Sequence, residues 1–168
     1  FDVPDAANAI FILNANRYCG RKDISSTISA FAKAFSHFHT PVYLCLHTPG
    51  LNDERKVALE KLIQQSGCPA AILLNPLGNE YLTDEKLVKL YQACAIGVNT
   101  SLGEGWGMIS FEHAACNAAQ VVPGNSACKE LWTGHGMVIP CSHIVQLNNS
   151  PFQLMGVDTN ALAAALVQ

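Results

Sequence analysis

Two glutamates eight residues apart enclose a glycine-rich turn in the segment 104–112, which reads EGWGMISFE. Gly105 and Gly107 allow the backbone of such a turn to approach a ligand closely. A helical pattern follows, and the amide groups and aligned peptide dipoles at a helix N-terminus favour an anion. A carboxylate on each side of an anion site suits a ligand with hydroxyls on both sides of a phosphate. A nucleotide-sugar has this layout of ribose, pyrophosphate and sugar.

Two basic residues, Arg17 and Lys22, follow the first apolar run of the chain. Arginine can hold phosphate oxygens in a bidentate fork, and lysine adds a point charge on a flexible stem. Each charge-assisted hydrogen bond contributes about 1.5–3 kcal/mol. Two such groups and a helix N-terminus suffice to hold a diphosphate, so we expect no metal and no other cofactor. Arg21, which lies between them, is interpreted as a surface residue.

The elements that must position these residues alternate between strand and helix. The apolar runs predict strands at residues 9–14, 42–47, 70–74, 95–99, 120–123 and 137–140. Helices are expected at 22–38, from Asn52 or Asp53 to Gly67, from Thr83 or Asp84, at 107–117, at 126–132 with Ser126 as cap, and from Asp158 or Thr159. Residues 141–157 are expected to form a loop.

This alternation predicts one α/β domain over residues 1–168, with an open, mostly parallel Rossmann-like sheet and helices on both faces. Ligands of such sheets bind at the carboxyl ends of the strands, near the point where the strand order reverses. The loops 14–22, 75–78 and 100–107 all fall at that edge. Residues far apart in sequence are therefore expected to converge there.

Composition excludes several classes of function. The chain has 168 residues, of which 49% are hydrophobic and 14% charged, and its net charge is −3. A nucleic-acid binder would carry a basic face, so no nucleic-acid partner is expected. No apolar run approaches the roughly 20 residues that span a bilayer, and no signal peptide opens the chain, so no transmembrane segment is expected.

The seven cysteines are odd in number and never spaced as Cys-x-x-Cys. Several of them lie in apolar stretches, such as Cys45 and Cys94. This distribution is typical of reduced core thiols in a cytoplasmic protein and does not favour a disulfide framework or a zinc site.

The whole pattern resembles the C-terminal, donor-binding domain of retaining glycosyltransferases of family 4, also called group 1, which have the two-domain GT-B fold. The resemblance rests on three stretches in the family's order, which are ILNANR at 12–17 followed by Lys22, LYQAC at 90–94, and NTSLGEGWGMISFE at 99–112. The last stretch contains the Glu-x7-Glu signature. Asn117 stands where a glycine commonly ends the signature helix, and asparagine can adopt the left-handed conformation needed there.

The resemblance implies three catalytic residues. Arg17 and Lys22 would hold the donor diphosphate and stabilise the charge that develops as the nucleoside diphosphate leaves. Glu104 would contact hydroxyls of the donor sugar near the reacting carbon. The implied activity is that of a glycosyltransferase of the hexosyltransferase type, acting in glycan biosynthesis with retention and without a metal.

The resemblance also implies the residues that bind the rest of the nucleotide-diphosphate sugar. Glu112 would bind the ribose hydroxyls, and the loop at Asn75 would lie beside the base. Backbone amides of the glycine-rich turn would cradle the phosphates, from Gly105, Trp106, Gly107 and Met108.

Members of this family carry an N-terminal domain that binds the acceptor, and 168 residues leave no room for it. We therefore interpret the chain as the donor half of a sugar transferase, inactive or weakly active alone. A non-catalytic nucleotide-sugar-binding or scaffolding module derived from such a domain is the alternative. A dinucleotide-binding oxidoreductase is not favoured, because no Gly-x-Gly-x-x-Gly follows the first strand. The base, the sugar and the acceptor stay open.

Overall fold

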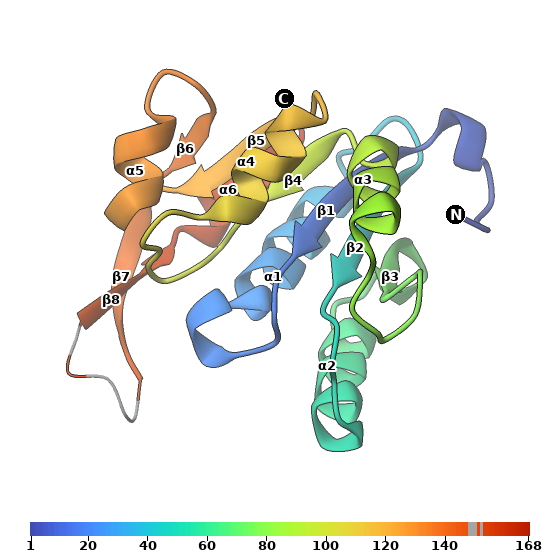
Figure 1. The fold of residues 1–168 in the computed structure, drawn as a ribbon, viewed down its shortest axis with the longest axis horizontal. Helices are drawn as coiled ribbons and strands as arrows, with labels where there is room; N and C mark the ends of the chain where they lie inside the picture. Colours follow the sequence, from blue (N-terminus) through green and yellow to red (C-terminus); the bar gives the residue numbers. More distant parts are fainter. Residues whose placement is uncertain (148–150, 152) are drawn as a thin grey trace.

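The computed structural model describes residues 1–147, 151 and 153–168 (Figure 1). Among these residues, six strands form one sheet in the order β3-β2-β1-β4-β5-β6, and each neighbouring pair is parallel. The strands are β1 (Ile10–Ala15), β2 (Val42–His47), β3 (Ile72–Leu74), β4 (Ile96–Val98), β5 (Ala119–Pro123) and β6 (Met137–Ile139). The order reverses between β1 and β4, so the sheet is the predicted Rossmann-like α/β sheet.

Helices cover both faces of this sheet. They are α1 (Ile24–Phe35), α2 (Asp53–Gln65), α3 (Asp84–Ala93), α4 (Met108–Ala115), α5 (Ser126–Trp132) and α6 (Thr159–Leu166), with short 3-10 turns η1 (Ala6–Asn8), η2 (Gly20–Lys22) and η3 (Pro69–Ala71). Ile12 of β1 packs in the cluster that contains α1, α2 and α6, while the adjacent Leu13 packs with α3. Neighbouring side chains of a strand point to opposite faces, so both layers bury apolar surface.

Several predicted helix ends are confirmed. Asn52 caps α2 by accepting a hydrogen bond from the Arg55 amide at 3.0 Å. Asp158 caps α6 by accepting from the amides of the first turn. Asn117 adopts the left-handed conformation after α4, with φ of 70°. No helix in the described ranges combines the length and hydrophobicity of a membrane span.

Two predictions about the last third of the chain are wrong. Part of the expected loop forms an antiparallel hairpin of β7 (Cys141–Gln146) and β8 (Gln153–Val157), and residues 148–150 and 152 lie outside the described part. Most of β7 is exposed, so no buried apolar run marks it in the sequence. Ser126 does not cap α5, because the capping position belongs to Asn125.

A chain of buried polar side chains links β1, α1 and the loop after β4. The Asn14 amide donates to the Thr27 hydroxyl at 2.7 Å, and the Thr27 and Thr100 hydroxyls are 2.9 Å apart. The Thr100 hydroxyl donates to the carbonyl oxygen of Asp23 at 2.8 Å. Asn14, Thr27 and Thr100 are each 0% exposed. These bonds therefore hold β1, α1 and the loop after β4 together at the carboxyl edge of the sheet.

The chain of hydrogen bonds gives a stability prediction. Thr27→Val keeps the shape of the side chain but leaves Asn14 and Thr100 without their shared partner. Because unpaired buried groups are costly, we expect the free energy of unfolding in urea to fall by about 1–3 kcal/mol. Ser29→Ala, on an exposed position of the same helix, should change it by less than about 0.5 kcal/mol. If Thr27→Val and Ser29→Ala had equal free energies of unfolding, the buried hydrogen bonds would not have this stabilising role.

Candidate functional site

Two adjoining cavities lie at the carboxyl edge of the sheet, at the reversal between β1 and β4. One, the Lys22 cavity, measures about 310 Å³ and is lined by Asn16, Lys22, Asn99, Glu104, Trp106, Gly107, Met108 and Ile109. The other, the Arg17 cavity, measures about 210 Å³ and is lined by residues that include Arg17, His47, Tyr81, Tyr91 and Glu112. Asn16 and Ile109 line both cavities, so the two cavities are direct neighbours.

Glu104 is the centre of a charged cluster in the Lys22 cavity. One of its oxygens contacts the ammonium group of Lys22 and accepts from the Ser101 hydroxyl at 2.7 Å. The other oxygen lies 3.1 Å from the guanidinium group of Arg21. Burial raises the pKa of Glu104, but the hydrogen bonds from Lys22, Ser101 and Arg21 prevail, and the pKa lies below its ordinary value. The carboxylate is therefore ionised at neutral pH.

Arg21 is exposed, as the sequence analysis interpreted it, but it also takes part in the site. Its guanidinium group also donates to the carbonyl oxygen of Gly103, and its own carbonyl oxygen accepts from the Leu102 amide at 2.9 Å. The side chain is 43% exposed, yet Arg21 contacts three consecutive residues of this loop through its side chain and backbone. Its position beside Lys22 in the turn η2 is the sequence signal that could have revealed it.

The backbone of Glu104 is fixed by a residue that the sequence analysis gave another role. The Glu104 amide donates to the Ser126 hydroxyl at 2.9 Å, and that hydroxyl donates to the Asn125 side chain at 2.9 Å. Ser126 has φ of 46°, a left-handed conformation that costs energy for a residue other than glycine. The strain is tolerated because the surrounding contacts hold the loop at the site.

The hairpin contributes to the same loop from the other side. The Met155 amide of β8 donates to the carbonyl oxygen of Leu102 at 3.2 Å. The Asn125 side chain donates to the carbonyl oxygen of Met155 at 2.8 Å. The hairpin therefore supports the loop that carries Glu104.

The Arg17 cavity holds the second pair of predicted residues. The guanidinium carbon of Arg17 lies 5.9 Å from the centroid of the Tyr81 ring. Glu112 lies on an exposed position of α4 and accepts from the Tyr91 hydroxyl at 2.9 Å. Burial, and then the Glu112 carboxylate, raise the pKa of Tyr91, so the phenol stays protonated and donates.

The start of α4 lies between the pair of Lys22 and Glu104 and the pair of Arg17 and Glu112. Gly107 precedes the helix with φ of 80°, and no side chain in the described ranges caps the helix there. Trp106 and Met108 are 52% and 57% exposed beside the Lys22 cavity. An uncapped helix N-terminus offers amide donors and a positive dipole end to an anion.

Two predicted residues lie apart from the cavities. Gly105 is exposed and is not a lining residue of either cavity. Asn75 uses its side chain to hold the backbone of Thr48, accepting from its amide at 2.6 Å and donating to its carbonyl oxygen at 3.1 Å. Its φ of 45° makes the sharp turn after β3. Asn75 therefore joins the loops after β2 and β3 and lines neither cavity.

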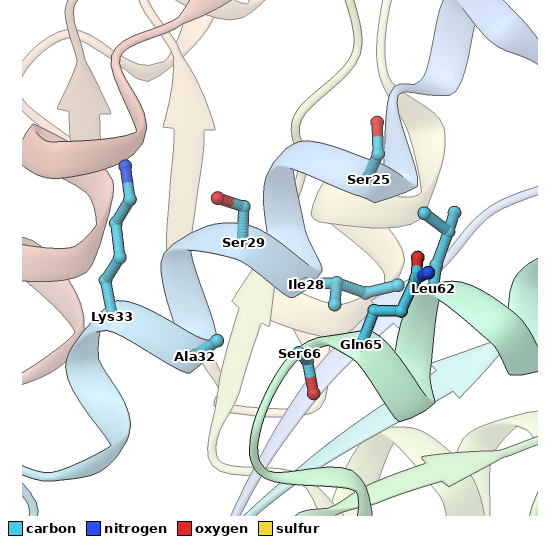
Figure 2. A pocket seen from close by; sticks show the side chains of 8 residues that line it. All are labelled: Ser25, Ile28, Ser29, Ala32, Lys33, Leu62, Gln65 and Ser66. Carbon is cyan, nitrogen blue, oxygen red and sulfur yellow. The ribbon is translucent and has the colours of Figure 1, made fainter.

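A further cavity of about 440 Å³ lies between α1 and α2 and contains no predicted site residue (Figure 2). Its lining includes Ser25, Ser29 and Ser66 but no carboxylate. Lys33 points away toward α6, where it donates to Thr159 at 2.6 Å and Asn160 at 2.8 Å. Its cationic group is thus already bound, and this cavity is not the candidate site.

Some known proteins resemble this chain in fold. No protein-family model and no curated protein matches the chain. Solved structures do match. They include a UDP-forming α,α-trehalose-phosphate synthase from Burkholderia xenovorans in complex with glucose-6-phosphate (14% identity, TM-score 0.74). Others are the E. coli trehalose-6-phosphate structure bound with UDP-2-fluoro glucose (14%, 0.73) and a sucrose-phosphate synthase from Thermosynechococcus elongatus (20%, 0.71).

Each match covers 96% of this chain and 35–36% of the neighbour, so the chain spans about a third of their length. The chain therefore has the Rossmann-like fold found in glycosyltransferases of the GT-B type. These neighbours are trehalose-phosphate and sucrose-phosphate synthases and do not establish the expected family 4. In the part of the chain that is described, no group of three or more His, Cys, Asp or Glu residues could hold a metal.

The charged cluster predicts how stability depends on pH. Because the pKa of folded Glu104 lies below its ordinary 4.5, its stabilising effect is complete above that pH and is lost as pH falls through the folded pKa. At about pH 7, Glu104→Gln should lower the free energy of unfolding by about 1–3 kcal/mol. The deficit should shrink below pH 4.5 in urea titrations. Glu130→Gln, on an exposed position, is the control. A deficit independent of pH would contradict the assignment.

Proposed function

We propose that the chain is the donor-binding domain of a glycosyltransferase that moves a sugar from a nucleotide-diphosphate sugar to an acceptor with retention of configuration. The observation that supports this most is the pair of adjoining cavities, each with one cation and one carboxylate, on either side of the start of α4. A nucleotide-sugar needs these groups in this order, with a carboxylate for the ribose, cations for the diphosphate and a second carboxylate for the sugar. Membership of family 4 and a cytoplasmic location belong to the same proposal.

The diphosphate binds at the junction of the cavities. Lys22 reaches it from one side and Arg17 from the other, and the amides at the start of α4 add donors. In the free protein Lys22 is paired with Glu104, so a diphosphate binds by drawing the ammonium group away from that carboxylate. Positive charge at this point stabilises the departing nucleoside diphosphate, with no metal required.

Glu104 binds hydroxyls of the donor sugar. A carboxylate can accept about four hydrogen bonds, and three donors contact it in the free protein. When Lys22 turns to the diphosphate, an acceptor position becomes available to a sugar hydroxyl. Arg21 and Ser101 keep the carboxylate ionised and in place during this exchange. The sugar is thereby oriented beside the bond that breaks.

Glu112 binds the ribose hydroxyls in the Arg17 cavity. The Tyr91 hydroxyl orients its carboxylate through one oxygen. Because the residue is exposed, its other acceptor positions can meet a ligand. The ribose is thereby placed between the base and the diphosphate.

The acceptor site lies outside this chain in our proposal. The neighbouring glycosyltransferases are about three times longer, and an N-terminal acceptor-binding domain accounts for part of that length. We expect the 168-residue chain to bind a donor but to transfer sugar poorly or not at all. Donor binding without turnover in the longer parent protein would instead favour a non-catalytic nucleotide-sugar-binding or scaffolding module.

Calorimetric titration with uridine, guanosine and adenosine diphosphates tests the site. Lys22→Ala should weaken the best nucleotide by about 10- to 150-fold, because one charge-assisted contact worth about 1.5–3 kcal/mol is lost. Glu112→Ala should weaken it by about 5- to 10-fold, because a ribose contact is lost.

The controls are Lys61→Ala and Glu130→Ala, which change exposed residues of α2 and α5. Both should bind the nucleotide like the unmodified chain. If the best nucleotide bound Lys22→Ala and Glu112→Ala as tightly as the unmodified chain, the site assignment would be wrong.

A further inference from the structure

Two buried polar atoms of residues that line the Arg17 cavity have no hydrogen-bond partner among the described residues. They are Oδ1 of Asn16 and Nδ1 of His47, and each residue is 4% exposed. An unpaired buried polar atom destabilises a folded protein. An apolar side chain could replace His47 at lower cost, whereas the amide group of Asn16 is used by Asn14. A ligand that pairs with Nδ1 of His47 and Oδ1 of Asn16 would satisfy both atoms.

The orientation of the Asn16 side chain follows from the buried polar chain. The Thr100 hydroxyl donates to the carbonyl oxygen of Asp23, so its contact with Thr27 requires the Thr27 hydroxyl as donor. Thr27 then accepts from the amide nitrogen of Asn14, and Asn14 Oδ1 accepts from the Asn16 amide at 2.8 Å. Each of these four hydrogen bonds therefore has a defined donor and a defined acceptor. Asn16, which lines the cavity, therefore keeps its side-chain oxygen, an acceptor, without a partner among the described residues.

His47 lies beside Asn16 at the end of β2. Its carbonyl oxygen accepts from the Asn16 backbone amide at 3.1 Å. Burial lowers the pKa of His47, so its ring is neutral at pH 7. A neutral imidazole can donate or accept at Nδ1 according to its tautomer. The two residues thus offer one fixed acceptor and one adaptable group.

The rest of the cavity suits a flat ligand with a polar edge. Its lining includes the apolar side chains of Leu82, Leu87 and Ile109. Tyr81, which is 64% exposed, contributes an aromatic ring beside the Arg17 guanidinium. Apolar walls with a few convergent polar groups are typical of small-molecule sites. A heterocyclic base has the matching form, since its faces stack on aromatic rings and its edge forms hydrogen bonds.

We propose that Asn16 and His47 recognise the edge of the donor's nucleobase and determine which base the protein accepts. This inference rests on the proposed function. Asn16 accepts from an N–H group of the base, and His47 pairs with the neighbouring group on the same edge. Glu112 in the same cavity then binds the ribose of that nucleoside.

The test is base selectivity, measured by calorimetry with the three nucleoside diphosphates and with inorganic pyrophosphate. His47→Phe keeps a ring but removes the nitrogen, and Asn16→Leu removes the acceptor. Each should weaken the preferred nucleotide at least 10-fold and bring its affinity close to those of the other two. Pyrophosphate affinity should stay within 2-fold. Lys22→Ala should weaken pyrophosphate and all three nucleotides by a similar factor, with selectivity retained.

Two further measurements separate recognition of the base from a structural role. The preferred nucleotide methylated at its base N–H should bind the unmodified chain at least 10-fold more weakly, but should lose little in Asn16→Leu. His47 lies outside the polar chain of Asn14, so His47→Phe should unfold at the same urea concentration as the unmodified chain or at a higher one. Strong destabilisation of His47→Phe with unchanged selectivity would show a structural role and overturn the inference.

The outcomes also separate this inference from the proposed function. If Lys22→Ala weakened nucleotide binding while Asn16→Leu and His47→Phe kept full selectivity, the recognition of the base would be wrong and the proposed function would stand. If none of the three nucleotides bound the unmodified chain, both would be wrong.

Discussion

The ion pair of Lys22 and Glu104 joins the turn before α1 to the loop after β4, across the point where the strand order reverses. The two side chains are 15% and 8% exposed, so a ligand that removes one partner must leave the other paired. Glu104 stays paired because Arg21 and Ser101 still donate to its carboxylate. Lys22 stays paired only if the ligand is an anion that can contact its ammonium group. The pair therefore confines binding to ligands that replace a carboxylate with another anionic group.

The surrounding structure keeps this pair in place through polar contacts as much as through apolar packing. The chain from Asn14 to Thr100 fixes the loops of β1 and β4, and Ser126 and the hairpin fix the backbone next to Glu104. Each of these contacts joins segments distant in sequence. The backbone on both sides of the ion pair is thus held by several hydrogen bonds, while Trp106 and Met108 are exposed beside it.

Elements whose structure is decided by local sequence pattern could be predicted from the residues alone. Buried parallel strands are apolar runs, and their carboxyl ends meet at one edge of the sheet. The strand order therefore predicted that four site residues lie near one another, which are Arg17, Lys22, Glu104 and Glu112. Partners that depend on tertiary contacts were not predictable in this way. Arg21 meets Glu104 across 83 positions and Ser126 meets it across 22. The hairpin was missed because exposed strands carry little apolar pattern.

The central claim is that a diphosphate binds between Lys22, Arg17 and the start of α4. An NMR titration of the isotope-labelled chain with a nucleoside diphosphate tests it most directly. The account predicts that the amide resonances of Met108 and Ile109 and the side-chain resonances of Lys22 and Arg17 shift together, with one binding constant. Shifts confined to the cavity between α1 and α2, around Ser25 and Ser66, would contradict it.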